Sequence, residues 1–411
     1  MIDPVRFSRV RRWLRRYSLP LVASLGGVAG VAYAAAHRTP ASTAAPAAAV
    51  STDPVGPTEL QRDTVQDTVQ VALLLDTSSS MNGLINQARS HLWKMVDELG
   101  QMTRVVNGKT RGVRVELALY EYGNSALPEG EGFIRQVLPL TSDLDKVSEQ
   151  LNALFTNGGS EYAGQAIQAA VTSLTWSSDP SALKFVFVAG NESFNQGPVS
   201  ADAAMKLAAD KDITVQLIHC GGADPTWAAA AALAKSDLLT IDQNYVAQHI
   251  PSPQDAEILR LGNELNGTYM AYGRDGQAAM QRQAGADASS AKLSRKVALE
   301  RSALKAKAGY RNDRWDVVDA VANDGKWLEN AKETELPAEL RGKSLADKQQ
   351  LVAGKAASRA EIKAKIAKLE AERAAYVAAE QAKQKPVGAR SLETEMKKTA
   401  VKAAAKKGYR F

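Results

Sequence analysis

The stretch VQVALLLDTSSSMNG, residues 69–83, decides the fold that we expect for this chain. Its apolar run from Val69 to Leu75 has the length and the Val/Leu content of a parallel strand that is buried on both faces. The run ends at Asp76, and a pattern of helical period begins after Gly83. Open α/β sheets place their ligands at such strand-to-helix turns, just beyond the carboxyl end of a strand.

This turn carries a carboxylate and two hydroxyls at alternating positions, from Asp76, Ser78 and Ser80. Such hard oxygen atoms are the ligands that Mg²⁺, Mn²⁺ and Ca²⁺ prefer. A second interpretation needs no metal: Asp76 caps the following helix and the serines only fill the turn. The spacing alone does not separate the two interpretations.

Further strands and helices alternate outward from this stretch. Strands are expected at 69–75, 113–122, 132–140, 183–188, 213–218 and 238–241, and helices at 84–105, 143–155, 163–174, 201–209, 227–235 and 253–265. The turn between the second and third strands is rich in Gly, Pro and Asn, which favours a hairpin. The pattern predicts an α/β fold with a doubly wound, mostly parallel sheet and an antiparallel edge hairpin, followed by a helical, Lys/Ala-rich C-terminal region.

Asp76-Thr77-Ser78-Ser79-Ser80 resembles the D-x-S-x-S signature of von Willebrand factor type A (VWA) domains. In that family the signature forms the metal-ion-dependent adhesion site. The resemblance implies a Rossmann-like α/β domain whose upper rim holds a divalent cation, usually Mg²⁺ and alternatively Mn²⁺ or Ca²⁺. It also implies that a carboxylate of a protein partner is the final ligand.

Two further loops complete the family's site, and they match unevenly. The second loop usually reads G-G-T-x-x-x-G, and here Ser160 stands in the threonine's place within Gly158 to Gly164. The third usually reads T-D-G after a strand, and here Gly190 stands where the aspartate is expected. Glu161 or Glu192 could supply the missing charge, directly or through water. The metal-ligand set implied by the resemblance is Asp76, Ser78, Ser80, Ser160, Glu161 and Glu192.

Longer segments resemble a bacterial subgroup of exported VWA proteins over about residues 67–376. They include GLINQARSHLWKMVDELG (83–100), ALYEYGN (118–124) and YRNDRWDVVDA (310–320). This resemblance bears on fold and compartment more than on biochemical role.

The start of the chain has the layout of an export signal. Arginines cluster between Arg6 and Arg16, and Tyr17 to Ala36 carries no charge over about the 20 residues that span a bilayer. Residues 1–36 are therefore expected to be a cleaved signal peptide or an N-terminal membrane anchor, two alternatives that stay open. An Ala/Pro/Ser/Thr-rich linker follows at 37–66. The expected location is the periplasm, either free or anchored in the inner membrane.

After the expected VWA domain (67–275), the sequence changes character. Residues 285–380 are rich in Ala, Lys, Glu and Arg and predict helices, with a short heptad stripe from Ile362 to Tyr376. That stripe indicates either a coiled coil or a helix that packs on its own chain. Residues 381–411 are basic and read as a disordered tail that could bind polyanions.

The motifs of several enzyme classes are absent from the sequence. There is no nucleophile elbow with a Ser-His-Asp order, no H-E-x-x-H and no P-loop. The single cysteine, Cys220, rules out an intramolecular disulfide and sits where a small buried residue is expected. We therefore expect a non-enzymatic module that binds an Asp- or Glu-bearing protein partner through the cation. The alternative is a metal-independent VWA scaffold whose basic C-terminal region contacts an anionic envelope polymer, lipid or nucleic acid, of which nucleic acid is the least favoured.

Overall fold

The structure of the chain is a computed structural model that describes residues 66–242, 249–383 and 392–410. The expected signal peptide or anchor (1–36) and nearly all of the expected linker lie outside the described residues. Within the described ranges, no helix is both long and apolar enough to cross a membrane.

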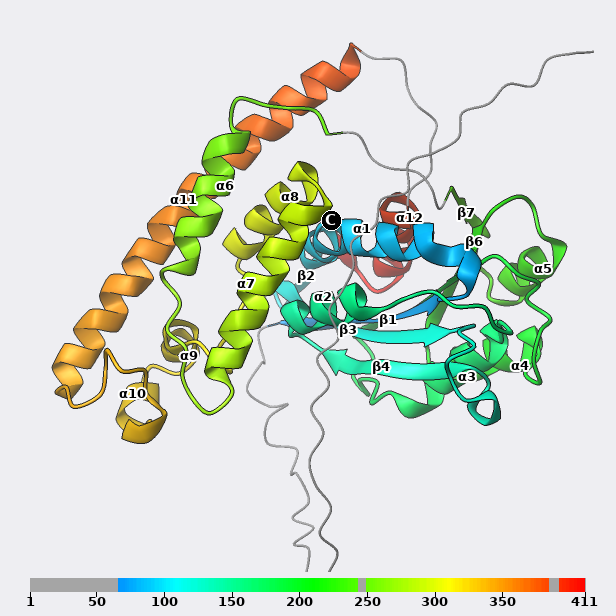
Figure 1. Cartoon of the computed structure of the whole chain (residues 1–411), viewed down its shortest axis with the longest axis horizontal. Coiled ribbons are helices and arrows are strands. Elements are labelled where there is room, and N and C mark those ends of the chain that lie inside the picture. The colour runs from blue at the N-terminus through cyan, green and yellow to red at the C-terminus, as the bar shows by residue number, and fades with distance from the viewer. Residues whose placement is uncertain (1–65, 243–248, 384–391, 411) are drawn as a thin grey trace, which may run out of the picture. The chain divides into compact units, whose positions relative to one another are not determined.

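Strands and helices alternate along the first part of the chain, and helices dominate after β7 (Figure 1). The strands are β1 (Asp67–Asp76), β2 (Thr103–Val106), β3 (Lys109–Tyr122), β4 (Ile134–Thr141), β5 (Leu183–Gly190), β6 (Thr214–Cys220), β7 (Leu239–Ile241) and β8 (Tyr409–Arg410). The helices that follow the early strands are α1 (Asn82–Gly100), α2 (Leu144–Ala153), α3 (Ala163–Ser173), α4 (Ala201–Asp210) and α5 (Pro225–Leu233). The later helices are α6 (Asp255–Asn266), α7 (Gly276–Leu293), α8 (Arg295–Ala306), α9 (Val317–Asn323), α10 (Trp327–Asn330), α11 (Leu345–Ala382) and α12 (Leu392–Lys406). Short 3-10 turns are η2 (Ser79–Met81), η3 (Glu129–Glu131) and η4 (Glu333–Glu335).

The strands form one sheet with β1 at its centre. Its order is β7-β6-β5-β1-β3-β2-β8, and β4 pairs with β3. β1 runs parallel to both β3 and β5, and β4 is antiparallel to β3. This arrangement confirms the predicted fold class, a mostly parallel sheet with an antiparallel edge hairpin and a helical C-terminal region.

Helices cover both faces of the sheet, which explains the near-continuous apolar run of β1. Alternate β1 side chains enter two different core clusters. Val69, Val71, Leu73 and Leu75 join the cluster that includes α1, whereas Ala72 and Leu74 join the cluster that includes α3, α4 and α5. The carboxyl end of β1 is thereby fixed at the rim of the sheet.

The segment 103–106 corrects the expected helix 84–105. It forms β2, which pairs with the start of β3. Asn107 and Gly108 connect the two strands with φ values of 51° and 75°. A two-residue hairpin loop with positive φ at both positions favours Asn-Gly, so this dipeptide was the signal for a hairpin.

The helix expected at 253–265 is α6, but the helix that packs on this part of the sheet is α12, near the end of the described residues. α6 packs on α8 and α11, while α12 packs on α1, β5 and β6 (Figure 1). The helices α6 to α11 therefore separate β7 from α12, which covers this face of the sheet. The expected boundary near 275–285 falls inside α7, and one core cluster contains residues of both the sheet and the helical region.

The prediction of a disordered tail at 381–411 is wrong for residues 392–410. The stripe Met396, Ala400 and Ala404 is buried in the core cluster that includes α1. β8 then pairs with β2, and the Arg104 guanidinium lies 5.2 Å from the centre of the Tyr409 ring. The many lysines concealed this stripe, whose four-residue spacing is that of one helix face.

Several of those lysines pair with acidic groups. Lys397 Nζ lies 3.0 Å from Glu98 Oε1, and Lys407 Nζ lies 2.7 Å from Asp212 Oδ2. Part of the basic charge of this segment is therefore compensated within the chain.

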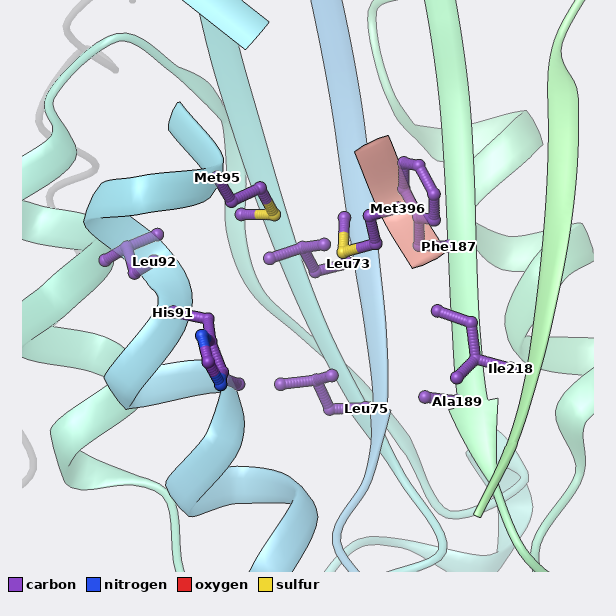
Figure 2. A pocket seen from close by; sticks show the side chains of 10 residues that line it. Leu73, Leu75, His91, Leu92, Met95, Phe187, Ala189, Ile218 and Met396 are labelled. Carbon is purple, nitrogen blue, oxygen red and sulfur yellow. The ribbon is translucent and has the colours of Figure 1, made fainter. Parts of the chain in front are cut away.

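A small apolar pocket lies beneath α12, between α1 and the sheet. Figure 2 shows Met396 of α12 facing Leu73 and Phe187 of the sheet, with His91 of α1 at its edge. Its volume of about 10 Å³ is near the lower limit for one water molecule. The contact between α12 and the sheet is thus almost completely filled.

The heptad stripe of α11 is used within the chain. Ile362 and Ile366 are buried, and α11 packs on α6 and α8. On the same helix, Arg359 Nη1 lies 2.6 Å from Asp316 Oδ2 and 2.8 Å from Asp319 Oδ1. This buried ion pair fixes α11 against the start of α9.

Candidate metal centre

The candidate site lies where three parallel strands end side by side. In the register of the sheet, Asp76 at the end of β1 pairs with Tyr122 at the end of β3. On the other side, Leu75 of β1 pairs with Ala189 near the end of β5. The Thr77 N–H donates to the Tyr122 carbonyl across 2.8 Å, which directs the chain into the turn before α1. The three loops that follow these strands or face them can therefore converge on Asp76.

Asp76 is completely buried, and only one of its two carboxylate oxygens accepts a hydrogen bond from a described residue. Oδ1 accepts a hydrogen bond from the Ser78 N–H at 2.7 Å. Oδ2 is buried without a hydrogen-bond partner among the described residues. The Ser78 and Ser80 hydroxyl oxygens lie 3.1 Å apart. A buried carboxylate oxygen without a partner is costly, and a bound cation would satisfy it.

A second carboxyl group stands beside Asp76. Glu161 is buried, and a Cβ at Gly123 would lie 2.9 Å from both Asp76 Oδ1 and Glu161 Cγ. Burial, and then the adjacent Asp76 carboxyl, raise the pKa of Glu161 to about 9. Burial also raises the pKa of Asp76. No described Lys or Arg forms an ion pair with either group, so Glu161 keeps its proton at neutral pH unless a cation is present.

Close backbone packing holds the second loop against the first. The Asn157 N–H donates to the Thr77 carbonyl at 2.9 Å. A Cβ at Gly159 would lie 2.4 Å from the Gly123 carbonyl oxygen, so glycine is required here. The Glu161 N–H donates to Gln196 Oε1 at 3.0 Å. Ser160, the expected threonine equivalent, is half-buried in this loop and makes no hydrogen bond to another described side chain.

The third loop shows why Gly190 replaces an aspartate. The Tyr122 hydroxyl donates to the Ala189 carbonyl at 3.0 Å. A Cβ at Gly190 would lie 2.4 Å from that hydroxyl oxygen and 3.3 Å from Asp76 Oδ2. The tyrosine therefore fills the space that a side chain at residue 190 would need.

Asn191 is a site residue that the sequence analysis missed. The Ser80 hydroxyl donates to Asn191 Oδ1 at 3.1 Å, which places an amide oxygen beside the first loop. Glu192, by contrast, has an exposed side chain, and only its backbone N–H approaches the site, 3.3 Å from Glu161 Oε2. The available signal was a polar residue directly after Gly190 at a strand end, although its side chain is an amide and the family pattern has a carboxylate in this loop.

Hydrogen bonds and close contacts join four of the six predicted residues in the structure. Asp76, Ser78, Ser80 and Glu161 lie together, whereas Ser160 and the Glu192 side chain do not join them through any hydrogen bond between described residues. No group of three or more His, Cys, Asp or Glu suited to a metal occurs in the described part of the chain. The oxygen set is two carboxyls, two serine hydroxyls and an amide, which suits a hard divalent cation.

Substituting Gly190 by alanine is expected to destabilise the protein by about 1–3 kcal/mol, because the new methyl group meets the Tyr122 hydroxyl. In a Tyr122→Phe background, the same substitution should cost clearly less. Urea unfolding of the four chains of this double-mutant cycle measures the difference. An equal cost of Gly190→Ala in both backgrounds would show that the hydroxyl is not the obstacle.

Residues 70–245 match the family model described as the von Willebrand factor type A domain. The chain therefore contains a VWA domain, which includes the three loops described above. No curated protein matches the chain.

Several solved structures share similarity with 43% of the chain. Proximal thread matrix protein 1 from the mussel byssus is 14% identical, with 42% of its own length covered and a TM-score of 0.33. The VWA domain of SpRpn10 is 16% identical, with 88% covered and a TM-score of 0.30. A VWA protein from Catenulispora acidiphila is 19% identical, with 39% covered and a TM-score of 0.32. One structure of the byssus protein has a zinc-occupied MIDAS motif. The matched region spans less than half the length of the byssus protein.

Proposed function

We propose that this chain is a non-enzymatic protein-interaction module that binds a carboxylate of its partner through a divalent cation. The observation that carries the proposal is the buried Asp76 carboxylate, whose Oδ2 has no hydrogen-bond partner among the described residues. VWA domains are generally interaction modules, and the family match supports this class of function. The expectation that the chain is not an enzyme belongs to the same proposal.

In this proposal Asp76, Ser78 and Ser80 hold the cation from the first loop, and Glu161 supplies the second negative charge. Glu161 thereby replaces the carboxylate that Gly190 cannot carry. Asn191 orients the Ser80 hydroxyl through their hydrogen bond. A bound dication would offer a coordination position to an Asp or Glu of the partner. Oxygen-only ligands favour Mg²⁺, with Mn²⁺ and Ca²⁺ as alternatives.

We place this activity in the cell envelope on the basis of the sequence. The arginine cluster and the uncharged stretch Tyr17 to Ala36 have the layout of an export signal or an anchor. Residues 37–66 would then act as a spacer between that segment and the VWA domain. Fractionation of cells that produce the full chain tests this placement, and recovery in the cytoplasm alone would contradict it.

Affinity capture tests the proposed function. The full chain is immobilised and exposed to a solubilised envelope fraction in Mg²⁺ or in a chelator. A partner should be retained in Mg²⁺, released by the chelator and absent from an Asp76→Asn chain. Asp67→Asn is a matched control, because Asp67 is also a buried β1 aspartate but pairs with Arg104 at the opposite end of the strand. Retention of the same partner in chelator and by Asp76→Asn would refute the metal-dependent mode.

The carboxyl pair also predicts how stability depends on pH in the presence of a chelator. The pKa of Glu161 is about 9 in the folded protein and 4.5 ordinarily. Between these values the folded state holds a proton that the unfolded state has lost. The free energy of unfolding should therefore decrease as pH rises from about 5 to about 8.

Thermal unfolding of wild type and Glu161→Gln isolates this contribution from other titrating groups. The wild type should lose stability relative to Glu161→Gln as pH rises in chelator. Saturating Mg²⁺ should reduce this difference in slope, since the cation replaces the proton. Parallel pH profiles of the wild type and Glu161→Gln in chelator would contradict the raised pKa of Glu161.

A further inference from the structure

A second cavity lies at the end of the sheet opposite the candidate metal centre. It is a cleft of about 630 Å³, lined in part by Val113, which pairs with Asp67 at the beginning of β1. Gln101, just after α1, also lines the cleft. The connection between α8 and α9 contributes Lys307, Ala308, Gly309, Arg311, Asp313 and Arg314. Clefts of a few hundred Å³ are the usual size of small-molecule sites. The VWA domain and the helical region thus build this cleft together.

Apolar and cationic side chains meet in the cleft. Val113 of β3, Leu144 of α2 and Leu304 of α8 are core residues, 3–6% exposed, whose edges form the apolar part of the lining. Arg311 and Arg314 contribute two exposed guanidinium groups from the connection between α8 and α9. An apolar surface with cations at its edge is suited to a ligand that has both an apolar body and an anionic head.

The two arginines are not neutralised by carboxylates. Arg311 Nη2 donates to the neutral amide of Asn323 at 3.1 Å, and Arg314 makes no ion pair with another described residue. Lys307, also on the cleft, lies 3.8 Å from Asp97, which is a long contact between two solvated groups.

The other charged residues of the cleft do not cancel the positive charge of Arg311 and Arg314. Arg114 is matched by Glu116, with nitrogen and oxygen 3.1 Å apart. The acidic lining residues are Asp97 and Asp313, against Arg114, Lys307, Arg311 and Arg314 on the basic side. The lining therefore carries more positive than negative groups.

We propose that this cleft binds a small amphiphilic carboxylate, with its carboxylate on Arg311 and Arg314 and its apolar body against Val113, Leu144 and Leu304. A guanidinium presents a planar fork of N–H donors that matches a carboxylate in a bidentate manner. The site is separate from the metal centre and does not depend on the proposed function of that centre.

Isothermal titration calorimetry of the full chain with 4-phenylbutyrate tests the proposal, and 4-phenylbutanol serves as the uncharged probe of the same shape. The acid should bind at one site per chain, and the alcohol at least about tenfold more weakly. The double variant Arg311→Gln/Arg314→Gln should weaken binding of the acid by about tenfold or more. Both positions are exposed, so the variant should keep the wild-type melting temperature.

Two further variants test whether binding is specific to this cleft. Arg274→Gln, at a residue whose side chain is 94% exposed in the connection between α6 and α7, should bind 4-phenylbutyrate as the wild type does. Asp76→Asn should also bind it normally, which separates this site from the metal centre. The proposal is overturned if the acid shows no binding at millimolar concentration, if acid and alcohol bind equally, or if the double variant keeps wild-type affinity.

Discussion

Replacing Arg301 by alanine is expected to lower the free energy of unfolding by about 3–5 kcal/mol, the largest effect on stability that we predict for a single residue. The Arg301 side chain is only 1% exposed and lies in α8 between two acidic groups. Its Nη2 lies 2.7 Å from Asp145 Oδ1, and its Nε lies 2.8 Å from Asp287 Oδ1. Its guanidinium carbon is 4.4 Å from the centre of the Trp93 ring.

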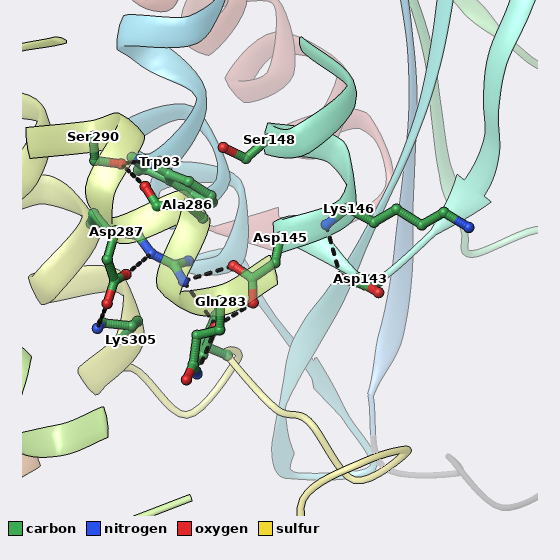
Figure 3. Close-up of polar contacts among 12 residues, drawn as sticks. Trp93, Asp143, Asp145, Lys146, Ser148, Gln283, Ala286, Asp287, Ser290 and Lys305 are labelled. Carbon is green, nitrogen blue, oxygen red and sulfur yellow. Dashed lines mark hydrogen bonds and ion pairs between the residues drawn. The ribbon is translucent and has the colours of Figure 1, made fainter. Parts of the chain in front are cut away.

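The cost is large because the cation joins parts of the chain that are far apart in sequence. Asp145 lies in the first turn of α2 and Trp93 lies on α1, both beside the sheet, whereas Asp287 lies on α7 (Figure 3). Lys305 Nζ lies 2.6 Å from Asp287 Oδ2, so Asp287 would keep a cation when Arg301 is removed. Asp145 would stay buried with only the hydrogen bond from the Tyr310 hydroxyl and no cation. An uncompensated buried charge is the main penalty of breaking such a pair.

Arg282→Ala is the matched control for this prediction. Arg282 also joins α7 to the start of α2, through Asp143 at 3.4 Å, but both side chains are partly exposed. Its removal should cost at most about 1 kcal/mol. Urea unfolding at neutral pH compares the two variants with wild type. Equal losses for Arg301→Ala and Arg282→Ala would mean that the buried network does not stabilise the union of the VWA domain with the helical region.

Asp76→Asn is expected to change stability in opposite directions with and without a divalent cation. In chelator the variant should melt at or above the wild-type temperature, because it removes one of two adjacent buried carboxyls. In Mg²⁺ the wild type should gain stability, by about 2.7 kcal/mol at a hundred times the dissociation constant. The variant should gain little, since the cation loses its central ligand.

Thermal unfolding in chelator and in a Mg²⁺ series measures both effects. The control is Asp67→Asn, which should be less stable than wild type in both conditions because it leaves Arg104 without its partner. It should nevertheless keep the full increment from Mg²⁺. An Asp76→Asn chain that gains as much stability from Mg²⁺ as the wild type would exclude Asp76 as a ligand.

The parts of the fold that follow from short stretches of sequence were predicted correctly. The apolar run before Asp76 and the alternation after it were sufficient for the parallel sheet. The buried stripe of α12 was not predicted, because small apolar residues separated by lysines have the composition of a solvated tail. Only the helix places these residues on one face. The Arg301 network was not predictable either, since its partners Asp145 and Asp287 are distant in sequence and nothing local marks a charge as buried.

The residues of the candidate site likewise fall into those that local motifs predict and those that depend on the fold. Asp76, Ser78 and Ser80 follow from one short motif, and Glu161 from its neighbourhood in a glycine-rich loop. The role of Tyr122 depends on strand register: β3 must lie beside β1 before its hydroxyl can reach the end of β5. A sequence comparison alone sees only a glycine where a carboxylate is expected.

Direct measurement of metal binding tests the central claim, that Asp76 and Glu161 together hold a divalent cation. Mn²⁺ is titrated into the full chain, and free Mn²⁺ is followed by electron paramagnetic resonance. The wild type should bind one Mn²⁺ per chain, Mg²⁺ should displace it, and both Asp76→Asn and Glu161→Gln should weaken binding by at least about tenfold. A wild type that binds no Mn²⁺, or an Asp76→Asn chain that binds it as tightly as the wild type, would contradict the account.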